Sequence, residues 1–197
     1  GVEGGIGMKE DLCPACGAEG WDGSVCSRCG ASPGKPHPSR LSPGTLLQGR
    51  YRIGSVLGQG GFGITYLAWD RSLELKLAVK EYFPLGLAAR EPGGPGVVPP
   101  AGEEGEAYQE GMERFLEEAR TLARFEGVRG VVSVRDSFRA HGTAYMVMTY
   151  LEGRTLKAHL EERGGRIPLE EALELLDPVM EALEEVHREG WLHRDVS

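Results

Sequence analysis

A glycine-rich stretch in the first third of the chain has the residue types and spacing to hold a phosphate group. Gly58, Gly60 and Gly63 form the pattern G-x-G-x-x-G, between residues 52–57 and 64–69, which we expect to be strands. Because glycine has no Cβ, backbone N–H groups in such a hairpin can approach phosphate oxygens closely. A tight turn without a ligand has the same composition, so the pattern alone leaves both interpretations open.

Two charged residues further along the chain could complete a nucleotide site. Lys80 ends the apolar segment 75–80, where its ammonium group could reach phosphate oxygens; a solvated charge at a strand edge is the alternative. Glu118 lies on the apolar face of a helix predicted over residues 115–125, three residues after Phe115. The other members of that face are Ala119, Leu122 and Ala123. A carboxylate on a buried face needs a cationic partner, and we expect Lys80 to be that partner.

The last residues of the chain include His193-Arg194-Asp195, which completes an ordered set of motifs. The order of glycine hairpin, Ala78-x-Lys80, helix glutamate, apolar hinge strand and His-Arg-Asp resembles the bacterial eukaryotic-like (Hanks-type) serine/threonine protein kinases. The resemblance covers residues 45–197, a predicted protein kinase domain. It implies an α+β fold: a protein-kinase-like N-lobe, made of an antiparallel sheet and one helix (αC), and the start of a helical C-lobe.

The resemblance also implies a role for each matching residue. Lys80, paired with Glu118, would hold the α- and β-phosphates of ATP, and Asp195 would accept the proton of a substrate hydroxyl as the γ-phosphate is transferred. The residues implied to bind the nucleotide are Leu57, Gly58, Gln59, Gly60, Gly61, Phe62, Gly63, Thr65, Ala78, Lys80, Met148 and Tyr150. Thr65 stands where these kinases usually carry valine, so the adenine contact there departs from the family pattern.

The implied function is that of an ATP-dependent kinase acting on serine and threonine hydroxyls of protein substrates, with Mg²⁺ as second cofactor. The asparagine and D-F-G aspartate that hold Mg²⁺ in this family would follow Ser197. We therefore expect this 197-residue polypeptide, taken by itself, to be an inactive fragment of a kinase. The alternatives are a non-catalytic pseudokinase that signals through its N-terminal module and, more remotely, a small-molecule kinase.

All four cysteines lie near the N-terminus in two C-x-x-C pairs, and each pair is followed by glycine. They are Cys13, Cys16, Cys26 and Cys29. Four thiolates aimed at one point suit tetrahedral Zn²⁺, so residues 8–31 are predicted to be a zinc ribbon. Two disulfides or a redox-active C-x-x-C are the alternatives, although disulfides fit a reducing compartment poorly.

A module of this length cannot bury enough apolar surface to fold without its metal. Trp21 is the large apolar residue that we expect to pack beneath the cysteine turns. The task of the module is open: it could dock a partner, sense metal or redox state, or cap the terminus. Residues 32–44 contain four prolines and are predicted to be a stiff, solvated linker, with His37 as part of it.

The remaining segments are assigned from composition and periodicity. Residues 84–105 are rich in proline and glycine and are expected to form a mobile surface loop. Strands are expected at 131–134 and 144–150, and helices at 155–163 and 169–188. Within the last helix we expect Pro178 to kink or split it. The apolar face of that helix is expected to contain Leu176, Met180, Leu183 and His187, the last as a core histidine.

Composition restricts the possible partners. The net charge of −8 argues against a nucleic-acid backbone as main partner. No apolar run in the sequence approaches the roughly 18 residues that a membrane span needs. A cytoplasmic location is therefore the expectation. The 40% content of hydrophobic residues is enough for a packed core.

Overall fold

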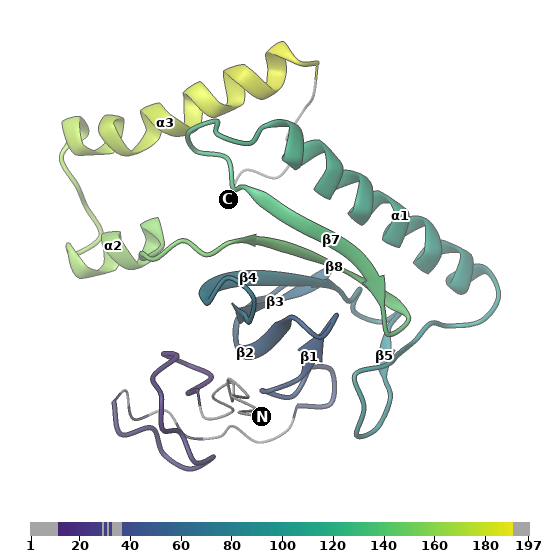
Figure 1. Cartoon of the computed structure of the whole chain (residues 1–197). Helices are drawn as coiled ribbons and strands as arrows, with labels where there is room; N and C mark the ends of the chain where they lie inside the picture. The colour runs from purple at the N-terminus through teal and green to yellow at the C-terminus, as the bar shows by residue number, and fades with distance from the viewer. Residues whose placement is uncertain (1–11, 29, 31, 33–36, 191–197) are drawn as a thin grey trace, which may run out of the picture.

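The molecule is built on a six-stranded antiparallel sheet. The computed structural model describes residues 12–28, 30, 32 and 37–190. The strand order is β1-β2-β3-β4-β8-β7. The strands are β1 Leu46–Leu47, β2 Tyr51–Gln59, β3 Gly63–Asp70, β4 Leu75–Tyr82, β7 Val134–Ala140 and β8 Thr143–Thr149. Figure 1 shows the sheet curling, with the purple N-terminal loops beside β2.

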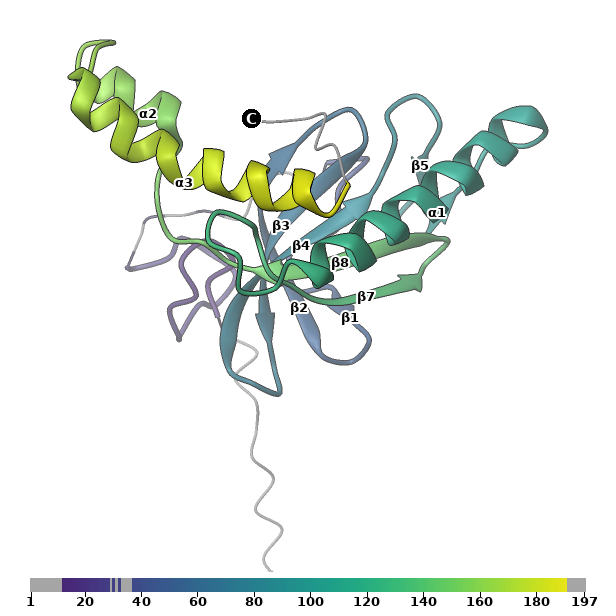
Figure 2. The same ribbon diagram turned by 90° about the horizontal axis from the view of Figure 1, so that it is seen from above.

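One long helix, α1 (Glu103–Arg124), lies along β7 and β8 on one face of the sheet. A small second sheet, β5 (Ala89–Arg90) paired with β6 (Val97–Val98), precedes it. Two helices follow the sheet, α2 (Leu156–Glu162) and α3 (Leu169–Arg188). The view from above in Figure 2 shows α3 passing beside the C-terminal end of α1, while α2 lies away from the sheet.

Aromatic side chains hold α1 against the sheet. The Tyr82 ring on β4 packs against the rings of Tyr108 and Phe115, with centroids 5.2 and 5.8 Å apart, and its hydroxyl donates to the Tyr108 carbonyl at 3.1 Å. Gly111 makes this approach possible, because a Cβ there would lie 2.1 Å from the Tyr82 hydroxyl oxygen. A glycine inside a helix costs roughly 1 kcal/mol relative to alanine, and here it gives the tyrosine room.

The other face of β4 carries a buried charged cluster around Glu81, which is fully buried. Arg90 Nη2 donates to both Glu81 carboxylate oxygens at 2.8 and 2.7 Å. The hydroxyls of Tyr66 on β3 and Tyr145 on β8 donate to the same carboxylate at 3.0 and 3.1 Å. Arg90 also donates to the Ser39 carbonyl at 2.9 Å. The cluster therefore joins three strands, the β5–β6 segment and the chain that enters the sheet.

Burial sets the protonation of this cluster. Burial raises the pKa of the Glu81 carboxyl, and the Arg90 guanidinium and the two tyrosine hydroxyls act in the opposite direction. Burial likewise raises the pKa of Tyr66 and Tyr145, with the neighbouring Glu81 charge adding to it. Both phenols therefore stay protonated and remain hydrogen-bond donors at neutral pH.

Most expected strands are present, but the segment 84–105 and the bounds of one strand differ from the prediction. The strands expected at 52–57, 64–69 and 75–80 lie within β2, β3 and β4. Residues 84–105 are not a loop throughout: they contain β5 and β6, the buried side chains of Arg90 and Val97, and the first turn of α1, which begins at Glu103. The strand expected at 131–134 starts only at Val134 and runs to Ala140.

The C-terminal helices have the expected positions but different buried faces. Helix α2 begins after Thr155, whose side chain caps it by accepting from Ala158 N at 3.1 Å. Helix α3 has the predicted bounds and runs as one element through Pro178. Its buried residues are Ala182 and Val186. Leu176, Met180 and His187 are exposed, so the core position predicted for His187 was wrong.

The expected linker packs against the sheet at its end. Leu41 is buried in the main hydrophobic core, and its N–H donates to the Tyr66 hydroxyl at 3.0 Å. His37 is exposed, as expected for a linker residue, and its Nδ1 lies 2.9 Å from the Ser39 hydroxyl. None of the helices in the described residues has the length and hydropathy needed to cross a membrane.

The Glu81–Arg90 pair makes the stability of the sheet sensitive to one arginine. We predict that Arg90→Ala lowers the free energy of unfolding by about 3–5 kcal/mol, because it leaves a buried carboxylate without its cation. The measurement is urea denaturation. Arg114→Ala is the matched control, since Arg114 pairs with Glu110 on the exposed surface of α1 and such pairs contribute little. Equal small losses in both variants would contradict the importance of the buried pair.

Candidate functional site

The glycine hairpin between β2 and β3 is held in place by backbone hydrogen bonds. Gly60 N donates to Gly63 O at 2.9 Å and closes the turn. Phe83 N donates to Phe62 O at 3.1 Å, and Leu85 N donates to Gly61 O at 2.9 Å. The tip of the hairpin is thus anchored to the segment after β4, while the Phe62 side chain is 80% exposed.

The glycines of this hairpin differ in whether the fold leaves room for a side chain. A Cβ on Gly63 would lie 2.6 Å from the Glu81 carbonyl oxygen, so this glycine is required by the close approach of β3 to β4. Gly58, Gly60 and Gly61 have open space where a Cβ would stand among the described residues, and none of them has a positive φ. The described fold therefore does not need glycine at these three positions, whereas a ligand approaching the backbone would.

Four of the residues expected to contact the nucleotide share one face of the sheet. Thr65 lies opposite Lys80 in the β3–β4 pairing, and Ala78 lies opposite Met148 in the β4–β8 pairing. Directly opposed residues have side chains on the same face, and so do Ala78 and Lys80, two residues apart. This is the face that α1 covers, and it is the opposite face to the one that carries Glu81.

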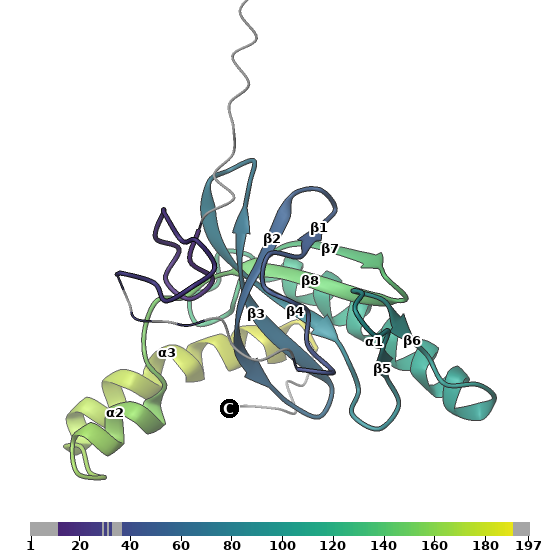
Figure 3. The ribbon, with the colours of Figure 1, turned by 90° about the horizontal axis from the view of Figure 1, so that it is seen from below.

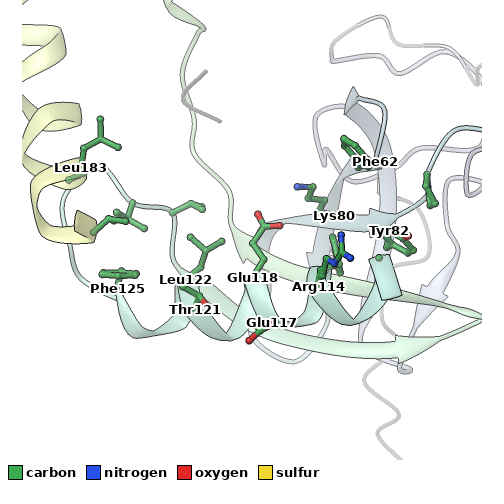
Figure 4. A pocket seen from close by; sticks show the side chains of 18 of the residues that line it. Phe62, Lys80, Tyr82, Arg114, Glu117, Glu118, Thr121, Leu122, Phe125 and Leu183 are labelled. Atoms are coloured by element: carbon green, nitrogen blue, oxygen red, sulfur yellow. The ribbon is translucent and has the colours of Figure 1, made fainter. Parts of the chain in front are cut away.

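Lys80 and Glu118 both line a cavity of about 1030 Å³ between β4, α1 and α3. Figure 4 shows the two side chains extending into it, with Phe62 on the hairpin side and Leu183 of α3 on the other. Within residues 37–190 no ion pair joins them; Lys80 Nζ lies 5.9 Å from the centroid of the Phe115 ring. Glu118 and Ala123 are exposed rather than on a buried face, so that part of the helix prediction was wrong.

Lys76 of β4 contacts two residues of the segment that follows β8. Its ammonium lies 3.1 Å from a Glu152 carboxylate oxygen and 6.0 Å from the centroid of the Tyr150 ring. Leu57, at the start of the hairpin, is 45% exposed, so an apolar ring could cover it.

Asp195, expected to be the proton acceptor, lies outside the described residues, as do His193 and Arg194.

A second candidate site is formed by three cysteines. The sulfurs of Cys13, Cys16 and Cys26 all lie within 4.8 Å of one another, and those of Cys16 and Cys26 are 3.8 Å apart. A tetrahedron with metal–sulfur bonds of about 2.3 Å has edges of roughly 3.8 Å, whereas a disulfide bond is about 2.05 Å. The spacing of these two sulfurs therefore fits metal ligands. Cys29 lies outside the described residues.

The two cysteine turns share one backbone hydrogen bond and one glycine conformation. Gly17 N donates to Cys13 O and Gly30 N donates to Cys26 O, each at 2.8 Å, and both glycines have positive φ, 69° and 72°. Trp21 is half-buried and donates to Ser24 O at 2.8 Å. The large ring directly against the first turn belongs instead to Trp69 of β3, a contact that no local signal in the sequence indicates.

The cysteine geometry predicts a measurable metal content. We expect the purified chain to carry one Zn²⁺ and Cys16→Ser to lose most of it, because a tetrahedral thiolate site loses one of its ligands. The measurement is colorimetric zinc release after thiol modification. His37→Ala, which changes an exposed residue of the linker, should keep one Zn²⁺ per chain. A metal-free parent, or full zinc in Cys16→Ser, would contradict the assignment.

Comparison with known proteins agrees with this geometry. Residues 100–197 match the family model described as protein kinase domain. The chain is 33% identical over 165 residues to the serine/threonine-protein kinase PksC of Streptomyces coelicolor, covering 80% of this chain and 26% of that protein. It is 34% identical over 163 residues to the serine/threonine-protein kinase PknA of Mycobacterium tuberculosis, covering 79% and 33%.

Solved structures give the same result for the fold. The structure of PpkA-294 in its apo form superposes with a TM-score of 0.73 at 36% identity, covering 81% of this chain and 56% of that one. The kinase domain of M. tuberculosis PknI superposes with a TM-score of 0.60 at 25% identity, covering 80% and 55%. The chain thus spans about a quarter to a third of the curated relatives' length and a little over half of these structures.

Proposed function

The chain belongs to the bacterial serine/threonine protein kinase family, and we propose that residues 45–197 supply the nucleotide-binding part of an ATP-dependent protein kinase. Its substrates would be serine and threonine hydroxyls of proteins. The observation that carries the proposal is the set of glycines at 58, 60 and 61, which the described fold does not require. The proposal also keeps residues 8–31 as a zinc ribbon and 32–44 as the linker.

The chain's own residues divide the work of binding. The hairpin would present its N–H groups to the phosphates, and Lys80 would hold the α- and β-phosphate oxygens from the cavity floor. The face that carries Thr65, Ala78 and Met148 would receive the adenine ring. Glu118 would reach Lys80 by a change of rotamer or a small shift of α1, since both already line one cavity.

The charge of the cavity lining supports a need for metal cations beside the nucleotide. Among the described residues, the charged side chains in its lining are those of Lys80, Arg114, Glu110, Glu117 and Glu118. Lys80 alone would not balance the charge of a triphosphate, and the family supplies Mg²⁺ for this purpose. Asp195, at the end of the chain, is the residue proposed to accept the proton of the substrate hydroxyl.

A non-catalytic signalling module is the second candidate. It is favoured by the position of the Lys80 ammonium over the Phe115 ring, with no ion pair to Glu118 within residues 37–190, because active kinases need that pair in place. Transfer of radiolabelled γ-phosphate to a protein substrate by the complete gene product that contains this chain distinguishes the two. Nucleotide binding without transfer would support the second candidate.

The glycine hairpin gives a test with its own control. We expect Gly60→Ala to keep the melting temperature and to weaken ATP binding about ten-fold, equivalent to ~1.4 kcal/mol, because the new Cβ stands in the space that phosphate would occupy. Gly63→Ala should lower the melting temperature, since its Cβ meets the Glu81 carbonyl oxygen. Calorimetric titration with ATP and thermal unfolding measure the two effects. Unchanged ATP affinity in Gly60→Ala would overturn the proposed role of the hairpin.

A further inference from the structure

The first cysteine turn lies on the open edge of β2. Strand β1 pairs only with Tyr51 and Arg52 on that edge, and Thr45, just before β1, accepts a hydrogen bond from Ile53 N at 2.8 Å. Two residues further on, Ser55 N points to the same edge, and it donates to Pro14 O at 2.8 Å. Pro14 lies between Cys13 and Cys16, so the cysteine turn continues the edge pairing beyond Thr45, on the N-terminal side of β1. The β2–β3 pairing is irregular at this point, between Ile53 and Val56.

Two glycines make the contact close. A Cβ on Gly17 would lie 1.8 Å from Cζ2 of the Trp69 ring, and a Cβ on Gly54 would lie 2.7 Å from Pro14 O. The Trp69 Nε1 atom is buried and makes no hydrogen bond within the described part of the chain. A glycine at each contact therefore allows the cysteine turn and the β2–β3 hairpin to touch, with an indole ring between them. Figure 3 shows the purple loops beside these two strands.

The N-terminal segment also touches the other end of the hairpin. Arg40 Nε donates to the Gln59 side-chain oxygen at 3.0 Å, and Gln59 stands between Gly58 and Gly60. The chain before the sheet therefore contacts the hairpin near its base, through Pro14 and Gly17, and at its tip, through Arg40.

We propose that the cysteine module is a metal-dependent brace on the nucleotide-binding hairpin. With Zn²⁺ held by the cysteines, the first turn keeps Pro14 and Gly17 against Ser55 and Trp69 and fixes the orientation of β2 and β3. Without the metal, a module of this size loses its folding free energy, the edge of β2 becomes exposed, and the hairpin gains motion. The effect on ATP rests on the proposed function, but the docking itself does not.

Hydrogen exchange at the Ser55 amide tests the docking directly. In the full chain, removing Zn²⁺ with a chelator should speed exchange at this amide by at least about five-fold, the effect of losing a hydrogen bond worth about 1 kcal/mol. Restoring Zn²⁺ should reverse the change. An exchange rate that does not respond to the metal would overturn the brace.

Gly17→Ala and Gly30→Ala form a matched pair of variants. Both glycines donate the matching turn hydrogen bond and have similar positive φ, 69° and 72°, so the backbone strain of an alanine should be similar at the two positions. Only Gly17 faces Trp69, because no atom of the described residues lies within 4 Å of a Cβ on Gly30. With Zn²⁺ bound, Gly17→Ala should speed Ser55 exchange by about five-fold or more and Gly30→Ala should not. Equal effects would overturn the proposal.

If Gly17→Ala fails to bind Zn²⁺, the comparison with Gly30→Ala cannot be made, and Trp69→Ala then tests the same contact from the other side. Trp69 lies outside the cysteine module, so this variant should retain one Zn²⁺ and still speed Ser55 exchange, while Trp69→Phe, which keeps a ring, should have a smaller effect. Slow exchange in Trp69→Ala with Zn²⁺ bound would contradict the brace.

ATP titration of the same proteins separates the brace from the proposed nucleotide site. If Ser55 exchange responds to Zn²⁺ but ATP does not bind, the brace stands and the nucleotide site is rejected. If ATP binds but Ser55 exchange does not respond to Zn²⁺, the nucleotide site stands and the brace is rejected.

Discussion

The alternation of side chains along β4 is the constraint on which the rest of the structure depends. Lys80 and Glu81 are neighbours, so they must face opposite sides of the sheet. Glu81 is fully buried and accepts hydrogen bonds from Arg90 and two tyrosine hydroxyls, and a buried carboxylate cannot leave such partners without a large free-energy cost. Its anchoring therefore fixes the strand register, and with it the direction of Lys80 into the cavity that α1 borders.

The hydrogen bonds around Glu81 also connect segments that are far apart in the sequence. Arg90 belongs to the small β5–β6 sheet and also binds the Ser39 carbonyl, so the chain on both sides of the main strands is connected to β4. At Gly63 the hairpin approaches the Glu81 carbonyl so closely that a side chain would not fit. Backbone hydrogen bonds from Phe83 and Leu85 anchor the tip of the hairpin, while Gly58, Gly60 and Gly61 leave open space beside the backbone. This combination suits a hairpin that presents its N–H groups to a ligand.

The helices and strands that depend mainly on local sequence patterns could be predicted from the sequence. The strands around the hairpin and the bounds of α3 follow from periodicity and glycine positions, and they agree with the structure. The segment 84–105 was missed because its prolines and glycines hide two short strands, and because α1 starts after Gly102, at φ 67°, without a side-chain cap. The exposure of Met180 and His187 was not predicted, because the side of α3 that becomes buried is set by how the helix packs on the rest of the fold and not by its own apolar spacing. The contact of Trp69 with Gly17 joins residues 52 positions apart, so local periodicity could not predict it.

The central claim is that Lys80 and the hairpin together hold nucleotide phosphates, and covalent labelling tests it most directly. An ATP-derived acyl phosphate transfers its acyl group to a lysine that lies beside the bound phosphates. We expect it to label Lys80 in preference to Lys157, whose side chain is 85% exposed on α2, and we expect excess ATP to prevent the labelling. Labelling that follows exposure, with Lys157 modified first and Lys80 unprotected by ATP, would contradict the account.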